Sequence, residues 1–261
     1  MPGPDPTASF VVIVLRDVTQ QHRIEQMRVD FVANASHELR TPLASLLGFI
    51  DTLQGPARND AMARERFLAI MRAQADRMSR LVDDLLSLSR IELTAHLKPD
   101  TPVDVGLIIA HVADTLAPLA KERDVELRLQ RSPEQLRVLG ERDELIRVFE
   151  NLVGNAIKYG ASGGRVDIAA FAVAGSRGRS GEAVITIRDF GPGIPAEHLP
   201  RLTERFYRVD ANQSRDKGGT GLGLAIVKHI LARHRGRLII ESAPGQGALF
   251  MVRLGTAPPS G

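Results

Sequence analysis

The sequence predicts an α+β protein with two main parts: a long antiparallel helical hairpin, followed by an α/β sandwich. Over residues 20–91, apolar side chains recur at steps of three and four, which is typical of amphipathic helices. One polar stretch, at residues 54–60, interrupts this pattern. From about residue 104, helical segments alternate with short β-branched segments, which indicates a mixed α/β domain. With 261 residues and 43% hydrophobic content, the chain can form both cores.

The first nineteen residues do not fit either part. Residues 1–9 are rich in proline and polar side chains, which favours disorder, and residues 10–15 (FVVIVL) read as one strand. Because a single strand cannot bury itself, we expect residues 10–19 to be the end of another domain, and the chain to be a fragment. The apolar run is far shorter than the roughly 20 residues needed to span a bilayer, and no membrane segment is expected in this chain.

Charge and cysteine content exclude several classes of protein. The formal net charge is +3, with acids and bases interspersed, so the sequence does not indicate a nucleic-acid binder. There is no cysteine, which excludes disulfides and thiolate metal sites and is compatible with the cytoplasm. Composition therefore predicts a folded, soluble protein and does not by itself fix its compartment.

The helical hairpin is predicted over residues 20–93. Its first helix spans residues 20–53, and its second continues past residue 91. A lone hairpin cannot cover the apolar stripe of both helices, so two hairpins should pair into a four-helix bundle. The sequence therefore predicts a homodimer.

A polar linker with two prolines is expected at residues 94–103, and the sandwich domain at 104–255. Its predicted helices are 105–122, 142–159 and 221–233, and its predicted strands are 125–130, 165–173, 183–188, 237–241 and 249–254. We expect residues 175–181 to form a flexible hairpin loop and residues 256–261 to be a disordered tail.

One turn of the first helix combines a histidine with a proline. On a helical wheel with Phe31 at zero, the apolar arc centres near about 70° and His37 falls near about 240°, so its ring should face water. Pro42 has no amide hydrogen, which removes a helix bond from Glu38 and should bend the axis. An exposed imidazole beside a carboxylate is a usable nucleophile for phosphorylation on nitrogen, although an ordinary solvated helix face also looks like this.

Three later segments carry groups suited to a nucleotide. In residues 150–159, Asn151, Asn155 and Lys158 share one helix face, where amide oxygens suit Mg²⁺ and the lysine suits phosphate; a solvated face is the alternative. In the second, Asp189 follows a strand in DFGPGI and could accept the amine of adenine, or it belongs to an ordinary turn. The third, KGGTGLG at residues 217–223, runs into a helix and could cradle phosphates, but fits neither a P-loop nor a Rossmann motif.

Taken together, these motifs resemble those of two-component sensor histidine kinases. SHELRTPL at residues 36–43 looks like the phosphoacceptor box, and the three nucleotide segments resemble the N, G1 and G2 boxes of the Bergerat-type ATP fold. ERFYRVD at residues 204–210 is similar to the F box. The resemblance covers about residues 20–254, and residues 10–19 are similar to the end of a PAS sensory domain. The pattern is also similar to the phosphate-sensing branch of the family.

The resemblance implies an ATP-dependent kinase with Mg²⁺ as its metal. It implies that His37 accepts the phosphoryl group, Glu38 acts as general base, and Thr41 positions water when the same domain dephosphorylates its partner. The phosphoryl group would pass to an aspartate in the receiver domain of a response regulator. The chain would then be the cytoplasmic part of a longer parent protein. The resemblance is compatible with a parent protein that is anchored in the inner membrane.

In the nucleotide half, the resemblance makes Asn155 the Mg²⁺ ligand, Asp189 the residue that recognises adenine, and Arg208 a contact for the γ-phosphate. It implies a lid over residues 209–220 that is ordered by nucleotide. The other residues implied at the nucleotide belong to the same boxes: Asn151, Lys158, Tyr159, Gly191, Gly193, Phe206, Lys217, Gly219, Thr220, Gly221, Leu222 and Gly223.

Two other functions remain open at this point. The first is an ATP hydrolase or conformational clamp, like the gyrase and heat-shock relatives of this fold; those carry a water-activating glutamate where this chain has Asn151, although Glu150 is adjacent. The second is a non-catalytic dimeric adaptor, against which the complete set of nucleotide boxes argues. The sequence does not identify the stimulus or the regulator. It also leaves open whether phosphorylation runs within one chain or between two.

Overall fold

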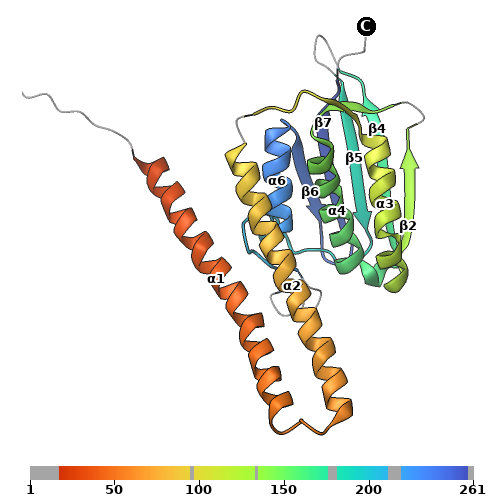
Figure 1. Cartoon of the computed structure of the whole chain (residues 1–261). Helices are drawn as coiled ribbons and strands as arrows, with labels where there is room; N and C mark the ends of the chain where they lie inside the picture. The colour runs from red at the N-terminus through yellow and green to blue at the C-terminus, as the bar shows by residue number, and fades with distance from the viewer. Residues whose placement is uncertain (1–17, 95–96, 133–134, 176–180, 211–218, 258–261) are drawn as a thin grey trace, which may run out of the picture.

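The computed structural model describes residues 18–94, 97–132, 135–175, 181–210 and 219–257. A two-helix hairpin projects from an α/β domain, and the second half of its second helix lies along that domain (Figure 1). The predicted strand at residues 10–15, the disordered start, most of the 175–181 loop, most of the lid, Lys217 and the end of the tail lie outside the described residues.

The hairpin consists of α1 (Thr19–Gln54) and α2 (Ala61–Leu93), as the sequence predicts. Helix α1 continues through Pro42 without interruption. A short turn after Gly55 reverses the chain. Asp60 then caps α2 by accepting a hydrogen bond from the Ala63 N–H at 2.9 Å, which satisfies one of the free amides at the helix start.

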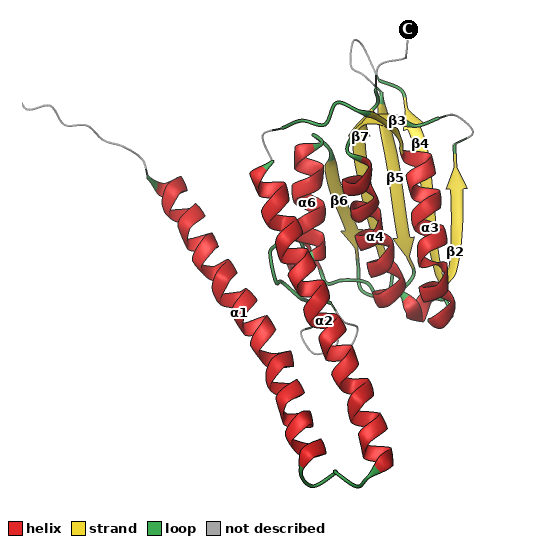
Figure 2. Ribbon diagram, viewed as in Figure 1, coloured by secondary structure: helices red, strands yellow, loops and turns green. Residues whose placement is uncertain are grey.

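The second domain is a sandwich of one sheet and one helical layer (Figure 2). Its five strands are ordered β2-β4-β5-β7-β6, where β2 and β4 are parallel and every other pair is antiparallel. The strands are β2 (Glu126–Arg131), β4 (Arg165–Val173), β5 (Glu182–Asp189), β6 (Arg237–Ser242) and β7 (Ala248–Gly255).

Three helices cover one face of this sheet: α3 (Val105–Glu122), α4 (Arg142–Tyr159) and α6 (Gly223–Arg233) (Figures 1 and 2). Helix α4 forms the centre of the core, because Phe149, Leu152 and Ile157 are fully buried. The fully buried Ile187 of β5 and the nearly buried Phe250 of β7 are directly paired across the sheet and belong to the same core. The central strands of the sheet and α4 therefore share one core.

Helix α2 belongs to both parts of the molecule. Its Leu81, Leu88 and Ile91 are buried in the same apolar core as α6, against which α2 packs. Burying one such side chain contributes about 1.5–3 kcal/mol, so this contact is a substantial interface. Because the sequence spacing alone assigned these residues to the stripe inside the hairpin bundle, their contact with the second domain was not expected.

Several short elements depart from the sequence prediction. The predicted linker contains β1 (Pro102–Asp104), which pairs antiparallel with β3 (Arg137–Leu139), and neither strand was predicted. Short 3-10 helices at Ala161–Gly163 and Ala196–Arg201 were also missed. Three to six residues are too few to show a period. The predicted tail is attached at its start, because Thr256 forms a β-bridge with Val138.

Candidate nucleotide and phosphoacceptor site

A cavity of about 660 Å³ lies between α4, the end of β5, the glycine-rich segment and α2. The three segments that the sequence singled out for a nucleotide all contribute to its wall. Eleven residues predicted at the nucleotide line it: Asn151, Asn155, Lys158, Tyr159, Asp189, Gly193, Arg208, Gly219, Thr220, Gly221 and Gly223. Segments more than 70 residues apart therefore build one site.

Helix α4 presents its polar face to the cavity. Asn151, Asn155 and Lys158 occupy successive turns, so their side chains point to the same side. Burial lowers the pKa of Lys158, and the positive charges of Arg80 and Arg123 lower it further, while Asp84 acts in the opposite direction. A desolvated lysine beside another cation favours an anionic ligand, and phosphate is the anion that this residue set suits.

Asp189 lies at the end of β5 and is almost fully buried. Its Oδ1 accepts hydrogen bonds from the N–H groups of Gly191 at 3.0 Å and Ala248 at 3.2 Å. Burial raises the pKa of Asp189, whereas these two bonds lower it. Because both backbone bonds go to Oδ1, Oδ2 is the oxygen available to a donor in the cavity, such as an exocyclic amine.

Gly193 is required by the shape of the turn that follows Asp189. Its φ is +72°, and a Cβ there would lie 2.0 Å from the carbonyl oxygen of Ala243. Any other residue is therefore both strained and blocked. Gly191 packs just as closely on Gly160, since a Cβ would meet the Gly160 Cα at 2.6 Å, but it does not line the cavity.

The glycine-rich segment leads directly into α6. Gly221 has a φ of +74°, and Gly223 lies against Asn151, because a Cβ on Gly223 would be 2.3 Å from Asn151 Oδ1. Two predicted residues are placed elsewhere. Leu222 is fully buried in the core, and Phe206 packs its ring on Phe31 of α1 with centroids 5.9 Å apart. Neither residue lines the cavity, so their side chains hold the segment and the hairpin in place.

The phosphoacceptor turn lies in the middle of α1. His37 is exposed, as the helical wheel predicted, and Pro42 is buried. Thr41 donates a hydrogen bond from Oγ1 to the carbonyl oxygen of His37 at 3.2 Å. The imidazole is therefore accessible to a ligand or to another domain. The hydrogen bond from Thr41 stabilises the helical turn that carries it.

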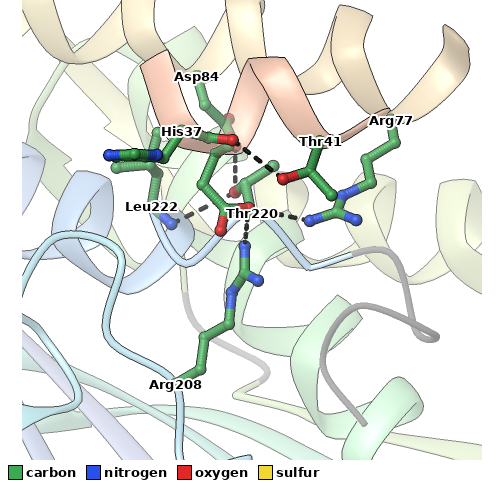
Figure 3. Close-up of polar contacts among 8 residues, drawn as sticks. His37, Thr41, Arg77, Asp84, Arg208, Thr220 and Leu222 are labelled. Carbon is green, nitrogen blue, oxygen red and sulfur yellow. Dashed lines mark hydrogen bonds and ion pairs between the residues drawn. The ribbon is translucent and has the colours of Figure 1, made fainter. Parts of the chain in front are cut away.

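Glu38 connects this turn to Arg208, and Figure 3 shows the side chains of Arg77 and Arg208 pointing toward the turn. Oε2 of Glu38 accepts hydrogen bonds from Arg77 on α2 at 2.9 Å and from Arg208 at 2.8 Å. Arg208 also lines the cavity, its side chain is only 6% exposed, and its Nε has no hydrogen-bond partner among the described residues. A buried guanidinium with a free N–H can serve a phosphate oxygen and a carboxylate together.

Helix α2 supplies cavity residues that sequence reasoning missed. Arg80, Asp83 and Asp84 line the cavity from the hairpin side. Asp84 accepts hydrogen bonds from Arg147 at 2.9 Å and from Thr220 at 2.7 Å. These pairs are 63 and 136 residues apart, and α2 carries no motif that indicates them, so only the packing of α2 on the second domain brings them together.

This combination defines a class of protein: a Bergerat-type nucleotide-binding domain attached to a helical hairpin that presents an exposed histidine. The comparisons with known proteins agree with that class. Residues 27–94 match the family described as His Kinase A (phospho-acceptor) domain, and residues 140–258 match the family of histidine kinase-, DNA gyrase B- and HSP90-like ATPases. The chain belongs to the sensor histidine kinases.

Two named sensor proteins are similar to this chain over most of its length. The phosphate regulon sensor protein PhoR of Pseudomonas aeruginosa is 43% identical over 239 residues, which is 92% of this chain and 52% of PhoR. The sensor-like histidine kinase SenX3 of Mycobacterium tuberculosis is 38% identical over 94% of this chain and 58% of SenX3. The chain thus spans little more than half the length of these relatives.

Among solved structures, full-length ShkA in complex with AMPPNP matches with a TM-score of 0.62 and 28% identity, over 87% of this chain and 46% of that one. The Acinetobacter baumannii histidine kinase AdeS matches with a TM-score of 0.65 and 24% identity, over 85% of this chain and 98% of that one, so the chain has the fold of a histidine kinase. Within the residues that the structure describes, no helix is long and apolar enough to cross a membrane.

Proposed function

We propose that this chain is the catalytic core of a sensor histidine kinase that phosphorylates its own His37 with ATP. One observation carries the proposal: Glu38, beside the exposed His37, is bonded to Arg208, and Arg208 lines the nucleotide cavity. The acceptor turn and the nucleotide cavity thus share a residue contact, although they lie 170 residues apart. The ATPase-family match and the AMPPNP complex of the ShkA relative support ATP as the nucleotide.

In the proposed reaction, a ring nitrogen of His37 attacks the γ-phosphorus, and the bond from that phosphorus to its bridging oxygen breaks, which releases ADP. Glu38 takes up the proton from the other ring nitrogen. Arg208 and Lys158 hold the phosphates and balance their charge. Oδ2 of Asp189 accepts a hydrogen bond from the exocyclic amine of adenine. Positioning and charge, rather than covalent chemistry by the nucleotide domain, account for the rate.

The residues in the cavity fit Mg²⁺ as the metal. Among the described residues, no group of three or more His, Asp or Glu side chains could hold a metal alone. Asn155 offers a hard amide oxygen beside the phosphate-binding Lys158. Mg²⁺ usually keeps several waters and takes phosphate oxygens as further ligands, so one or two protein oxygens suffice. When bound, the metal would neutralise phosphate charge, and Asn155 is its proposed protein ligand.

We propose that the working unit is a homodimer joined through the hairpin. Large apolar side chains on both helices of the hairpin remain exposed in a single chain, among them Leu43, Leu47, Val82 and Leu86. The exposed fractions of these four side chains lie between 41 and 54%, which is high for residues of this size on one hairpin. Pairing with a second hairpin would cover them. Light scattering on the purified chain tests this, and a monomer at micromolar concentration would contradict it.

The phosphoryl group would then pass to an aspartate of a response regulator receiver domain, and Thr41 would position water for the reverse dephosphorylation. The likeness to PhoR supports the phosphate-sensing branch, with the regulator of that branch as the partner. Transfer of label from the phosphorylated chain to a panel of receiver domains tests this. We expect rapid transfer to one receiver and slow transfer to the others.

Glu150 also lines the cavity, which favours direct ATP hydrolysis as the second candidate. Incubation with γ-labelled ATP separates the two functions. A kinase retains label on the protein in a form that survives alkali and is lost in acid, as expected for phosphohistidine. Release of free phosphate with no retained label would replace the kinase proposal with the hydrolase.

A further inference from the structure

Asp84 on the hairpin joins two walls of the nucleotide cavity through its two carboxylate oxygens. Oδ2 accepts the hydroxyl hydrogen of Thr220 in the glycine-rich segment at 2.7 Å, and Oδ1 accepts from Nη2 of Arg147 on α4 at 2.9 Å (Figure 3 shows the Thr220 bond). The Asp84 side chain is 19% exposed, so both bonds are partly shielded from water. A shielded carboxylate with a cation and a hydroxyl as partners is well compensated.

The Thr220 hydroxyl also makes a hydrogen bond at the start of α6. While it donates to Asp84, it accepts a hydrogen bond from the N–H of Leu222 at 3.3 Å. Leu222 is the residue that precedes α6, and Gly221 between them has a φ of +74°. The amides at this helix start are the groups suited to phosphate oxygens. Asp84 thereby restrains a glycine-rich stretch that would otherwise sample many backbone conformations.

On the other wall of the cavity, which is α4, Arg147 also contacts Asn151. Its carbonyl oxygen accepts a hydrogen bond from Nδ2 of Asn151 at 2.8 Å, one turn further along α4. Oδ1 of Asn151 in turn faces the Cα of Gly223 closely enough that a Cβ there would lie 2.3 Å away. A closed circuit of contacts therefore runs from Asp84 through the glycine-rich segment and α4 and back to Asp84.

We propose that Asp84 is a positioning residue for the nucleotide: by holding Thr220 and Arg147, helix α2 sets the phosphate-binding geometry of the second domain. The proposal rests on the proposed binding of ATP. It implies that the hairpin does more than present the histidine, because nucleotide affinity depends on the docking of α2. Any displacement of α2 by a partner or by an upstream domain would change that affinity.

The test is the affinity of the full chain for a non-hydrolysable ATP analogue with Mg²⁺, measured by calorimetry. Asp84→Ala should weaken binding about tenfold, the loss expected for a hydrogen bond to a charged group. The matched control is Asp76→Ala, a change at an exposed acid of the same helix that pairs with Arg72 and does not line the cavity. It should stay within about twofold of the wild type.

Three further variants separate positioning from general damage to the fold. Asp84→Asn keeps an acceptor for Thr220 but loses the charge for Arg147, and should lie between wild type and Asp84→Ala. Thr220→Val removes only the Thr220 contact, so it should weaken binding less than Asp84→Ala does, and Thr220→Ser should bind like the wild type because the hydroxyl is kept. The double variant of Asp84→Ala and Thr220→Val should be little worse than Asp84→Ala alone, since Asp84→Ala already removes the bond to Thr220.

Each outcome decides the matter. Equal weakening by Asp84→Ala and Asp76→Ala would show a general effect of lost negative charge on α2 and overturn the proposal. So would unchanged affinity in Asp84→Ala, or independent effects of Asp84 and Thr220. A wild-type chain that does not bind the analogue would contradict the proposed function itself, whereas normal wild-type binding with unaffected variants removes only the role of Asp84.

Discussion

Nη2 of Arg208 lies 2.8 Å from Oε2 of Glu38, and this bond links the nucleotide cavity to the turn that carries the histidine. Arg77 approaches the same oxygen from α2 at 2.9 Å. Two guanidinium groups therefore fix the position of one carboxylate beside His37. Besides its own helix α1, the helix α2 and the loop that carries Arg208 therefore hold Glu38 in place.

Glu38→Gln should keep the hydrogen bonds to the two arginines but abolish proton uptake by the side chain. A glutamine oxygen can still accept from Arg77 and Arg208, but the amide cannot take a proton from the imidazole. We expect retained label to form about 100-fold more slowly, as is typical when a general base is lost, with nucleotide affinity unchanged. Rates of labelling by γ-labelled ATP measure this. Glu65→Gln, at an exposed acid on the hairpin, is the control, and equal rates in the two variants would remove Glu38 from the role of base.

Asp189→Asn should change the nucleotide preference. The amide oxygen can keep the two backbone bonds to Gly191 and Ala248, which places NH₂ where the free carboxylate oxygen was. A donor there repels the amine of adenine and suits the carbonyl of guanine. We expect ATP affinity to fall about tenfold or more and the preference for ATP over GTP to shrink. An unchanged ratio of the two affinities would place adenine elsewhere.

The same variant should also change how stability depends on pH. Because burial raises the pKa of Asp189, the folded state holds its proton to a higher pH than the unfolded state does. The stability gained from the protonated form is complete below the unfolded pKa of 3.8 and is lost as pH rises through the folded pKa. Asn cannot titrate, so its stability relative to the wild type should rise over that range. Thermal unfolding across pH measures this difference, and a constant difference would refute it.

Asn155→Ala should weaken nucleotide binding only when Mg²⁺ is present. The side chain lines the cavity beside Lys158, and its proposed role is to hold the metal rather than the nucleotide itself. Calorimetric titrations with Mg²⁺ and with a chelator give the two affinities. Equal losses under both conditions would show that Asn155 contacts the nucleotide directly and that the metal ligand is another residue.

Gly193→Ala should destabilise the fold by about 2–4 kcal/mol or prevent folding, since φ is +72° and a Cβ would lie 2.0 Å from the Ala243 oxygen. Gly245→Ala is a matched comparison, because its φ is +77° but no atom of the described residues lies within 4 Å of the added Cβ. It should cost only about 1 kcal/mol of backbone strain. Urea unfolding gives both values. Similar losses at the two positions would mean that contact with Ala243 has no effect.

Much of the fold could be predicted because it follows from local periodicity. The boundaries of α3 and α4 coincide with the predicted helices at 105–122 and 142–159, where apolar side chains mark one face over five turns. The exposure of His37 followed from the same reasoning. The paired strands β1 and β3 were missed because three residues of each carry no period and are stabilised only by each other.

The site was predictable where motifs are contiguous and unpredictable where helices meet. The glycines and Asp189 are visible in the sequence because turns and close approaches need those residue types. Arg77, Asp84 and Arg147 carry no such signal: each is an ordinary charged residue on a helix, and its partner lies 39 to 136 residues away. Phe206 was expected at the nucleotide from its motif, yet it packs against Phe31 of α1.

The central claim, that the exposed ring of His37 receives the γ-phosphoryl group of ATP, is tested most directly by locating the retained label. Digestion of the labelled chain and mass spectrometry under alkaline conditions should place one phosphoryl group on His37. His37→Ala should abolish labelling while dimer mass and nucleotide affinity stay unchanged, and His111→Ala, at an exposed histidine of α3, should label normally. Undiminished labelling of the His37→Ala chain, or a phosphoryl group found on another residue, would contradict the account.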